Sequence, residues 1–179
     1  MRRTSIIALS ILISASTSAL AAPPAPPAEA DPFAITSPRI VEVSKKKGIR
    51  VAYDVKDDVW EAGIGKALYY VRGLLEAYKS MGVSPNQVKI SVVLHGPTVY
   101  WALKEDSYRQ FKNDPFDFNP NVQVIRELID HGVSVEICYS TMKGKGWVAD
   151  DLLPGTVIVH DAYTRLIDLQ QQGYAYIRF

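Results

Sequence analysis

The side chain best suited to covalent chemistry is Cys138, the single cysteine of the chain. It ends the predicted strand 133–138 and is followed by Tyr139, Ser140 and Thr141. A thiolate becomes a useful nucleophile where nearby N–H groups or cations stabilise it, so Cys138 is a candidate sulfur nucleophile. The hydroxyls of Ser140 and Thr141 are candidate donors to an anionic sulfur. The alternative is that Cys138 is a small buried side chain that finishes a strand, which is a common role for cysteine.

Other polar side chains also follow apolar runs in this sequence. His95 comes directly after the run 88–94, Asp54 lies near the end of an earlier run, and His160 precedes Asp161 after a third. In open parallel sheets, catalytic and ligand-binding groups gather beyond the carboxyl ends of the strands. We therefore predict that His95 donates a proton or stabilises an anionic sulfur, with a structural histidine bonded to its own loop as the alternative. The pair His160 and Asp161 is also typical of a strand end followed by a helix N-cap.

Several classes of function are excluded by residue counts and spacing. One cysteine can form neither an internal disulfide nor a paired-cysteine zinc or redox motif. The three histidines lack metal-ligand spacing, so no metal site is predicted. The sequence contains no dinucleotide fingerprint, P-loop or serine nucleophile elbow, and we predict no cofactor. The balance of 20 basic against 19 acidic side chains, without a basic run, argues against a nucleic-acid partner.

The first 21 residues have the pattern of a secretory signal peptide. Arg2 and Arg3 precede the apolar stretch 6–13, and the small residues Ala19-Leu20-Ala21 form a cleavage pattern. An uncleaved N-terminal anchor is the alternative. We expect cleavage after Ala21 and an exported protein, periplasmic or secreted, with no membrane span once the signal has been removed.

A short linker is predicted after the signal peptide. Residues 22–34 are rich in proline and alanine, and such a composition favours an extended spacer. The folded domain is expected over residues 35–179. Cleavage removes two arginines and no acid, which leaves 18 basic against 19 acidic side chains and a net charge of −1.

The domain alternates short apolar runs with amphipathic stretches, a pattern typical of βαβ units and a mainly parallel sheet. Strands are predicted over residues 49–55, 88–94, 133–138, 157–159 and 174–179. Helices are predicted over 64–81, after Thr98 as cap, from Pro120 to Gly132, and over 162–172 behind Asp161. The stretch 111–121 has turn residues and exposed phenylalanines, which we expect to pack back on the domain or to contact a partner chain.

Several motifs in fixed order resemble the DsrE/DsrF-like family, from about residue 49 to the C-terminus. They are Val93-Leu94-His95-Gly96-Pro97, Val99-Tyr100-Trp101-Ala102-Leu103, Asn119-Pro120-Asn121, Ile125-Arg126-Glu127-Leu128, Gly132-Val133, Cys138, Asp151-Leu152-Leu153-Pro154-Gly155 and Leu169-Gln170-Gln171-Gln172-Gly173-Tyr174.

The resemblance implies a three-layer α/β/α sandwich with a five-stranded parallel sheet, assembled into trimers or hexamers. It implies that the second and third strands are neighbours, so that His95 and Cys138 lie side by side. It also implies that Cys138 is a persulfide carrier. The sequence departs from the family where Tyr139 and Ser140 follow the cysteine, because close relatives have a glycine and an amide side chain there. Some family members relay sulfur for tRNA thiolation in the cytoplasm. An exported protein is in another compartment, so we do not expect that role here.

Three functions follow as hypotheses. The first is an exported sulfur carrier or sulfurtransferase-like relay in which Cys138 exchanges sulfur with a small sulfur species or a partner thiol, assisted by His95. The second is a non-catalytic oligomeric binding module whose pocket includes Thr98 and the aromatic walls Tyr100, Trp101 and Tyr139. The third is redox sensing through an intermolecular disulfide at Cys138.

Overall fold

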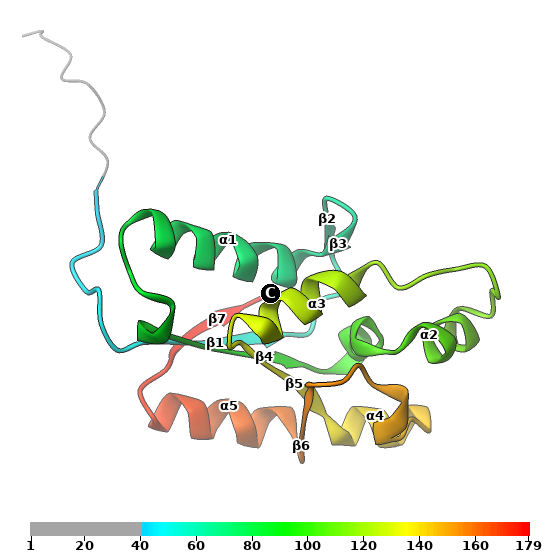
Figure 1. The fold of residues 1–179 in the computed structure, drawn as a ribbon. Helices are drawn as coiled ribbons and strands as arrows, with labels where there is room; N and C mark the ends of the chain where they lie inside the picture. The colour runs from blue at the N-terminus through cyan, green and yellow to red at the C-terminus, as the bar shows by residue number, and fades with distance from the viewer. Residues whose placement is uncertain (1–40) are drawn as a thin grey trace, which may run out of the picture. The chain divides into compact units, whose positions relative to one another are not determined.

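A computed structural model describes residues 41–179 of the chain (Figure 1). The predicted signal peptide, the predicted linker and the predicted start of the domain at residue 35 lie outside the described residues. None of the helices in 41–179 has the length and apolar character that crossing a membrane requires.

A five-stranded parallel sheet forms the centre of the domain. The strands are β1 (Ile49–Val55), β4 (Val88–Leu94), β5 (Ser134–Cys138), β6 (Val157–Val159) and β7 (Ala175–Arg178). Their order across the sheet is β6-β5-β4-β1-β7, and every adjacent pair is parallel. The predicted fold class is therefore confirmed.

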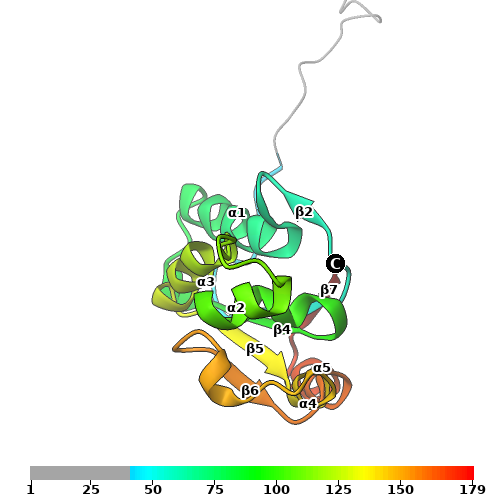
Figure 2. The ribbon, with the colours of Figure 1, turned by 90° about the vertical axis from the view of Figure 1, so that its right-hand side faces the viewer.

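Helices cover both faces of the sheet, which gives three layers (Figures 1 and 2). One face carries α1 (Lys66–Ser80) and α3 (Asn121–Asp130), and the other carries α4 (Tyr139–Lys145) and α5 (Ala162–Gln171). The further helix α2 (Glu105–Lys112) lies beyond the carboxyl end of β4, after the 3-10 helix η2 (Gly96–Ala102). Two shorter 3-10 turns are η1 (Pro85–Gln87) and η3 (Ala149–Asp151).

The central strands β1 and β4 are buried on both sides, apart from Arg50 and Lys89, because helices cover both sides. Val51, Tyr53 and Val55 join the large core beneath α1 and α3. Ala52 and Val93 point the other way and join a smaller apolar cluster beneath α5. This alternation decides which face each end-of-strand side chain reaches.

The first helix begins two residues later than predicted. Ile64 and Gly65 form the short strand β3 (Ile64–Gly65), which pairs with β2 (Trp60–Glu61) in a hairpin. The turn residues Ala62 and Gly63 both have positive φ, a conformation that a helix does not contain. A β-carbon on Gly65 would lie 2.5 Å from the Trp101 ring, so this position accepts only glycine.

The predicted helix after Thr98 is the 3-10 helix η2, and Thr98 does not cap it. The Thr98 hydroxyl donates to the carbonyls of Val55 and His95, and no side chain caps the N-terminus of η2. All residues from Thr98 to Ala102 are buried, so the segment lacks the solvent-exposed face of an amphipathic helix. The predicted loop 111–121 is also shorter, because α2 extends to Lys112.

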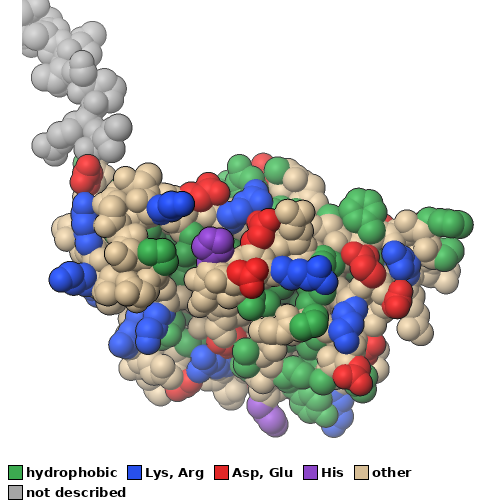
Figure 3. Space-filling view, viewed as in Figure 1, with side chains coloured by type: hydrophobic (Ala, Val, Ile, Leu, Met, Phe, Trp, Pro, Cys, Tyr) green, Lys and Arg blue, Asp and Glu red, His purple; other side chains and the backbone are tan. Residues whose placement is uncertain are grey.

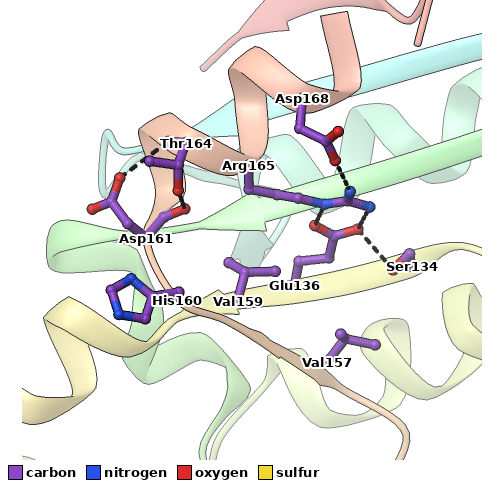
Figure 4. A pocket seen from close by; sticks show the side chains of 9 residues that line it. All are labelled: Ser134, Glu136, Val157, Val159, His160, Asp161, Thr164, Arg165 and Asp168. Carbon is purple, nitrogen blue, oxygen red and sulfur yellow. Dashed lines mark hydrogen bonds and ion pairs between the residues drawn. The ribbon is translucent and has the colours of Figure 1, made fainter. Parts of the chain in front are cut away.

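A buried ion pair joins α5 to the sheet (Figure 4). Arg165 of α5 donates from Nε and Nη2 to the two oxygens of Glu136, at 2.7 and 3.0 Å, and from Nη1 to Asp168 at 2.6 Å. Ser134 donates a further hydrogen bond to Glu136. The Glu136 side chain is almost fully buried, so its charge depends on Arg165 for compensation.

Removing the guanidinium should destabilise the fold more than removing the whole pair. We expect Arg165→Leu to lower the free energy of unfolding by about 3 kcal/mol, the low end of the range for broken buried pairs, because Arg165 is 29% exposed. The double variant Glu136→Leu with Arg165→Leu should recover most of this loss. Urea unfolding monitored by circular dichroism measures both values, and equal losses in the two variants would contradict this account of the pair.

Candidate functional site

Three polar or reactive side chains lie in a row at the carboxyl ends of neighbouring strands. Leu94 of β4 pairs with Ile137 of β5, so the next residues, His95 and Cys138, follow side by side. Asp54 lies near the end of β1, on the other side of β4. The register therefore brings together the predicted pair, His95 and Cys138, and adds Asp54 to it.

His95 and Asp54 form a buried hydrogen-bonded pair. Nε2 of His95 lies 2.6 Å from Oδ1 of Asp54, and each residue is 5% exposed. The backbone N–H of His95 donates to Val55 O, which holds the end of β4 against β1. With Nε2 engaged by the carboxylate, Nδ1 is the ring nitrogen left for proton exchange.

Two tyrosines complete this network. The hydroxyl of Tyr176 in β7 donates to Oδ2 of Asp54 at 2.5 Å, and the ring of Tyr163 in α5 packs edge-on against the His95 ring with 5.4 Å between centroids. The carboxylate of Asp54 raises the pKa of Tyr176, because a tyrosinate beside it would lose the hydrogen bond and face a like charge. Both tyrosine side chains are exposed, so the buried pair is in contact with side chains that reach the surface.

Cys138 is buried, with 3% of its surface exposed. It belongs to the apolar cluster beneath α5, where its neighbours include Val93, Ala162 and Leu166. The thiol therefore lies at the predicted edge of the sheet, in an apolar setting that a sulfur donor reaches only if the neighbouring side chains move.

The residues that follow Cys138 connect the ends of three strands. Thr141 accepts a hydrogen bond from the backbone N–H of Gly96, and Ser140 donates one to the carbonyl of His160. Tyr139 is 46% exposed. These three predicted binding residues lie around the end of β5. The Ser140 hydroxyl proton is already donated to His160, whereas Thr141 is the acceptor in its bond with Gly96 and that bond does not use its hydroxyl proton.

The other two predicted binding residues are separate from Cys138. Thr98 is fully buried and its hydroxyl is used within the backbone. Tyr100 packs in the large core and donates to the carboxylate of Asp58, which also accepts from the Trp101 indole at 2.9 Å. Burial, and then the Asp58 carboxylate, raise the pKa of Tyr100 to about 12. Tyr100 and Trp101 thus stabilise the β1–β2 connection and do not face the row of Asp54, His95 and Cys138.

His160 and Asp161 fit the structural alternative. The Asp161 carboxylate accepts from the backbone N–H groups of Tyr163 and Thr164, as an N-cap does. His160 lines a cavity of about 400 Å³ beside Glu136 and Arg165 (Figure 4). Cys138 is not among the residues that line this cavity. In residues 41–179 no group of three or more His, Cys, Asp or Glu side chains is arranged to hold a metal ion.

Comparison with protein families gives a match that covers most of the described residues. The model of the DsrE/DsrF-like family matches residues 64–179. The chain belongs to this family. The match includes β4 and β5 and therefore both His95 and Cys138, whereas Asp54 lies before the matched region.

A solved structure shares the fold. A protein of unknown function, MTH1491 from Methanobacterium thermoautotrophicum, is 24% identical, with a TM-score of 0.57, over 73% of this chain and 99% of that one. The ychN protein from E. coli is 14% identical, with a TM-score of 0.49, over 73% of this chain and all of that one. No functionally curated protein matches this chain.

Sequence reasoning did not identify Tyr163 and Tyr176 as part of the network. Tyr176 lies 122 residues from Asp54 in the chain, and only the pairing of β7 with β1 brings them together. Tyr163 directly follows the first residue of α5, where a partly exposed aromatic side chain has no distinctive sequence pattern.

The Asp54–Tyr176 hydrogen bond should appear in a tyrosine titration. The folded pKa of Tyr176 is raised above its ordinary value of 10.0, so the bond stabilises the fold below pH 10 and is lost as the pH rises through the higher folded pKa. We expect Asp54→Asn to move this titration back toward pH 10. Tyrosinate absorbance of each protein, minus that of the same protein carrying Tyr176→Phe, isolates this residue, and an unchanged midpoint in Asp54→Asn would contradict the assignment.

Proposed function

We propose that this protein is an exported sulfur carrier in which Cys138 holds sulfur as a persulfide. The observation that supports it most directly is the register of β4 and β5, which brings the single thiol of the chain beside the buried His95–Asp54 pair. Membership of the DsrE/DsrF-like family supports a sulfur-relay type of protein.

The transfer takes place in two displacements at sulfur. The Cys138 thiolate attacks the sulfane sulfur of a donor such as thiosulfate. A sulfur–sulfur bond forms to Cys138, the bond within the donor breaks, and sulfite leaves with the electron pair. An acceptor thiolate then attacks the outer sulfur of the persulfide, and Cys138 leaves as a thiolate. No net oxidant is needed, because the donor's sulfane sulfur is passed on at its own oxidation level.

The His95–Asp54 pair supplies the proton handling. His95 accepts the proton of the Cys138 thiol when the thiolate forms, and the resulting imidazolium is stabilised by the carboxylate already bonded to Nε2. Asp54 is a positioning residue in this scheme because it acts through His95. Tyr176 holds the second oxygen of Asp54 and so keeps the carboxylate facing the ring.

The burial of Cys138 supports a second candidate function. A thiol that is 3% exposed in an apolar cluster also fits a non-catalytic binding module of the same fold, in which Cys138 is only a packing residue. The two functions differ in whether a small sulfur species reaches the thiol. A carrier requires local opening around Tyr139 and Tyr163, two exposed side chains that adjoin Cys138 and His95.

Intact-mass measurement after incubation with thiosulfate or polysulfide tests the carrier directly. We expect an increase of about 32 Da per sulfur atom in the wild type and none in Cys138→Ser. His95→Gln should slow the loading about 100-fold, the contribution typical of a positioned acid–base group. His160→Gln is the matched control, because this exposed histidine directly follows β6, the strand next to β5, and should leave the loading rate unchanged.

Absence of a Cys138-dependent adduct with either donor would overturn the carrier and favour the binding module. A covalent dimer on non-reducing electrophoresis, lost in Cys138→Ser, would instead indicate redox sensing. Loading that is equally fast in His95→Gln would keep the carrier and remove the role given to the His95–Asp54 pair.

The proposed export is tested by the processed N-terminus. We expect the protein recovered from its host to begin at Ala22 and to lie outside the cytoplasm, as cleavage after Ala19-Leu20-Ala21 requires. N-terminal sequencing of the periplasmic and culture fractions makes the measurement, with Ala19→Asp and Ala21→Asp together as the uncleaved control. A chain that keeps Met1 in the cytoplasm would contradict the proposal.

A further inference from the structure

The even charge balance of the chain conceals an uneven distribution along the strands. The segments that directly precede the five strands of the sheet contain three lysines, one histidine and a single acid, Glu42. These segments are 41–48, 81–87, 131–133, 152–156 and 172–174. The amino end of the sheet is therefore positively charged, whereas the whole chain is close to neutral.

Two strand residues enlarge this positive charge. Arg50 and Lys89 are the second residues of β1 and β4, the register sets them side by side, and both are exposed. Figure 3 shows Lys and Arg side chains gathered at the left, where residues 41–48 and the starts of the strands lie in Figure 1. Together with Lys45, Lys46 and Lys47, all exposed, these two residues form a group that we call the basic end.

Hydrogen bonds hold the basic end on the domain. Lys46 Nζ donates to the carbonyl of Met81 at 2.8 Å, and Arg50 Nη1 donates to the carbonyl of Gln172 at 2.6 Å. These carbonyls belong to the C-caps of α1 and α5, where the helix dipole stabilises cations. Two of the five cations therefore have a structural role as well as a charge.

The other three cations of the basic end have no acidic partner in the described part of the chain. Lys45, Lys47 and Lys89 form no ion pair with another residue of 41–179. Glu42 lies 3.6 Å from Lys46 and is the one acid that pairs with this group. The charges of these three lysines are therefore available to an anionic ligand.

A cavity lies among these cations. It has a volume of about 480 Å³, and its lining includes Glu42, Ser44, Lys45 and Arg50. Sites for small ligands have volumes of roughly 300–1,000 Å³. The bond to Gln172 uses one of the five N–H groups of Arg50, so the guanidinium keeps donors for a phosphate oxygen. A phosphate group at this cavity meets two cations and one acid.

The rest of the domain does not offset the basic end. Lys79 and Glu76 near the end of α1 offset one another, and Asp130 is the last residue of α3. The carboxyl end of the sheet mixes both signs, with one lysine and two aspartates in 56–58 and two lysines and two aspartates in 143–151. Seven-residue strands separate the two ends by roughly 23 Å, well beyond the Debye length of about 8 Å. Solvent ions therefore screen the basic end from the acids at the carboxyl end.

These features favour a planar anionic lipid surface over a soluble polyanion. A plane contacts only the end that is turned toward it, whereas a long flexible polyanion also contacts acidic side chains elsewhere on the domain. Clusters of about four to eight basic side chains are typical of segments that bind anionic lipids. Four of the five cations are lysines, which act as point charges and need no bidentate partner. Val41, 78% exposed in the same segment, adds an apolar side chain suited to a lipid interface.

We propose that the basic end binds the surface of anionic phospholipids, with Lys45 and Arg50 facing the headgroup phosphates. All five strands are parallel and begin at the basic end, so their carboxyl ends then point away from the membrane. The edge that holds His95 and Cys138 is thereby turned toward the aqueous phase. The proposal stands on the distribution of charge and is independent of the sulfur-carrier function.

Flotation with lipid vesicles tests the membrane contact. We expect the protein recovered from its host to float with phosphatidylcholine vesicles that contain phosphatidylglycerol, and to stay in solution with vesicles of phosphatidylcholine alone. Lys45→Gln with Lys47→Gln should weaken the binding about 30-fold, as the loss of two basic side chains near an anionic surface implies. Glu42→Gln should strengthen it about 5-fold, because an acid that repels the headgroups is removed.

Lys143→Gln with Lys145→Gln is the matched control, because it removes two exposed lysines at the same spacing from α4, in a segment of mixed charge. Vesicle binding should be unchanged in this variant and in Cys138→Ser. A wild type that fails to bind phosphatidylglycerol vesicles, or that binds both kinds of vesicle equally, would overturn the proposal. So would a control variant that loses as much affinity as Lys45→Gln with Lys47→Gln. Binding of a single-stranded oligonucleotide without binding of the vesicles would overturn it in favour of a soluble polyanion.

Discussion

The parallel pairing of β4 with β1 on one side and β5 on the other is the constraint on which the site depends. This pairing sets Val55, Leu94 and Ile137 across from one another. His95 and Cys138 come one residue after that line, and Asp54, which bonds to His95, comes one residue before it. A shift by one residue would turn each of these side chains to the opposite face, because side chains alternate along a strand. The large core beneath α1 and α3 opposes such a shift, since it would move Val51, Val92 and their neighbours out of that core.

The two faces of the sheet differ in the side chains that they bury. The face beneath α1 and α3 is apolar and supplies most of the core. The face beneath α5 combines a small apolar cluster with two buried carboxylates, Asp54 and Glu136, each with its own partners. A buried carboxylate is costly unless it is paired and hydrogen-bonded. Glu136 is neutralised by Arg165 and anchors α5. Asp54 is instead hydrogen-bonded to His95 and Tyr176, and so it holds a histidine at the carboxyl ends of the strands.

The position of Cys138 fits both a carrier and a packing residue, for different physical reasons. Its place beside the His95–Asp54 pair provides a proton acceptor and follows from strand register. Its enclosure by Val93, Ala162 and Leu166 protects the thiol from solvent and from unwanted oxidation. A protected thiol suits a carrier that opens only when a partner docks. Membership of the DsrE/DsrF-like family supports a sulfur-relay type of protein.

The sequence by itself determined the parallel sheet, the strands β1, β4 and β6, and the Asp161 cap, because periodicity, turn residues and capping are local properties. It also indicated that His95 directly follows one strand and that Cys138 ends another. Only the tertiary structure decided that Asp54 is hydrogen-bonded to His95 and that Tyr176 and Tyr163 adjoin this pair. It also decided that the Thr98 hydroxyl bonds to backbone carbonyls and that Tyr100 packs in the large core, away from the site. Those contacts join residues distant in the chain or depend on burial from every side, and no local pattern encodes either. The same reason explains why the 3-10 helix η2 forms where a helix after Thr98 was predicted, and why Gly65 lies in a hairpin against the Trp101 ring.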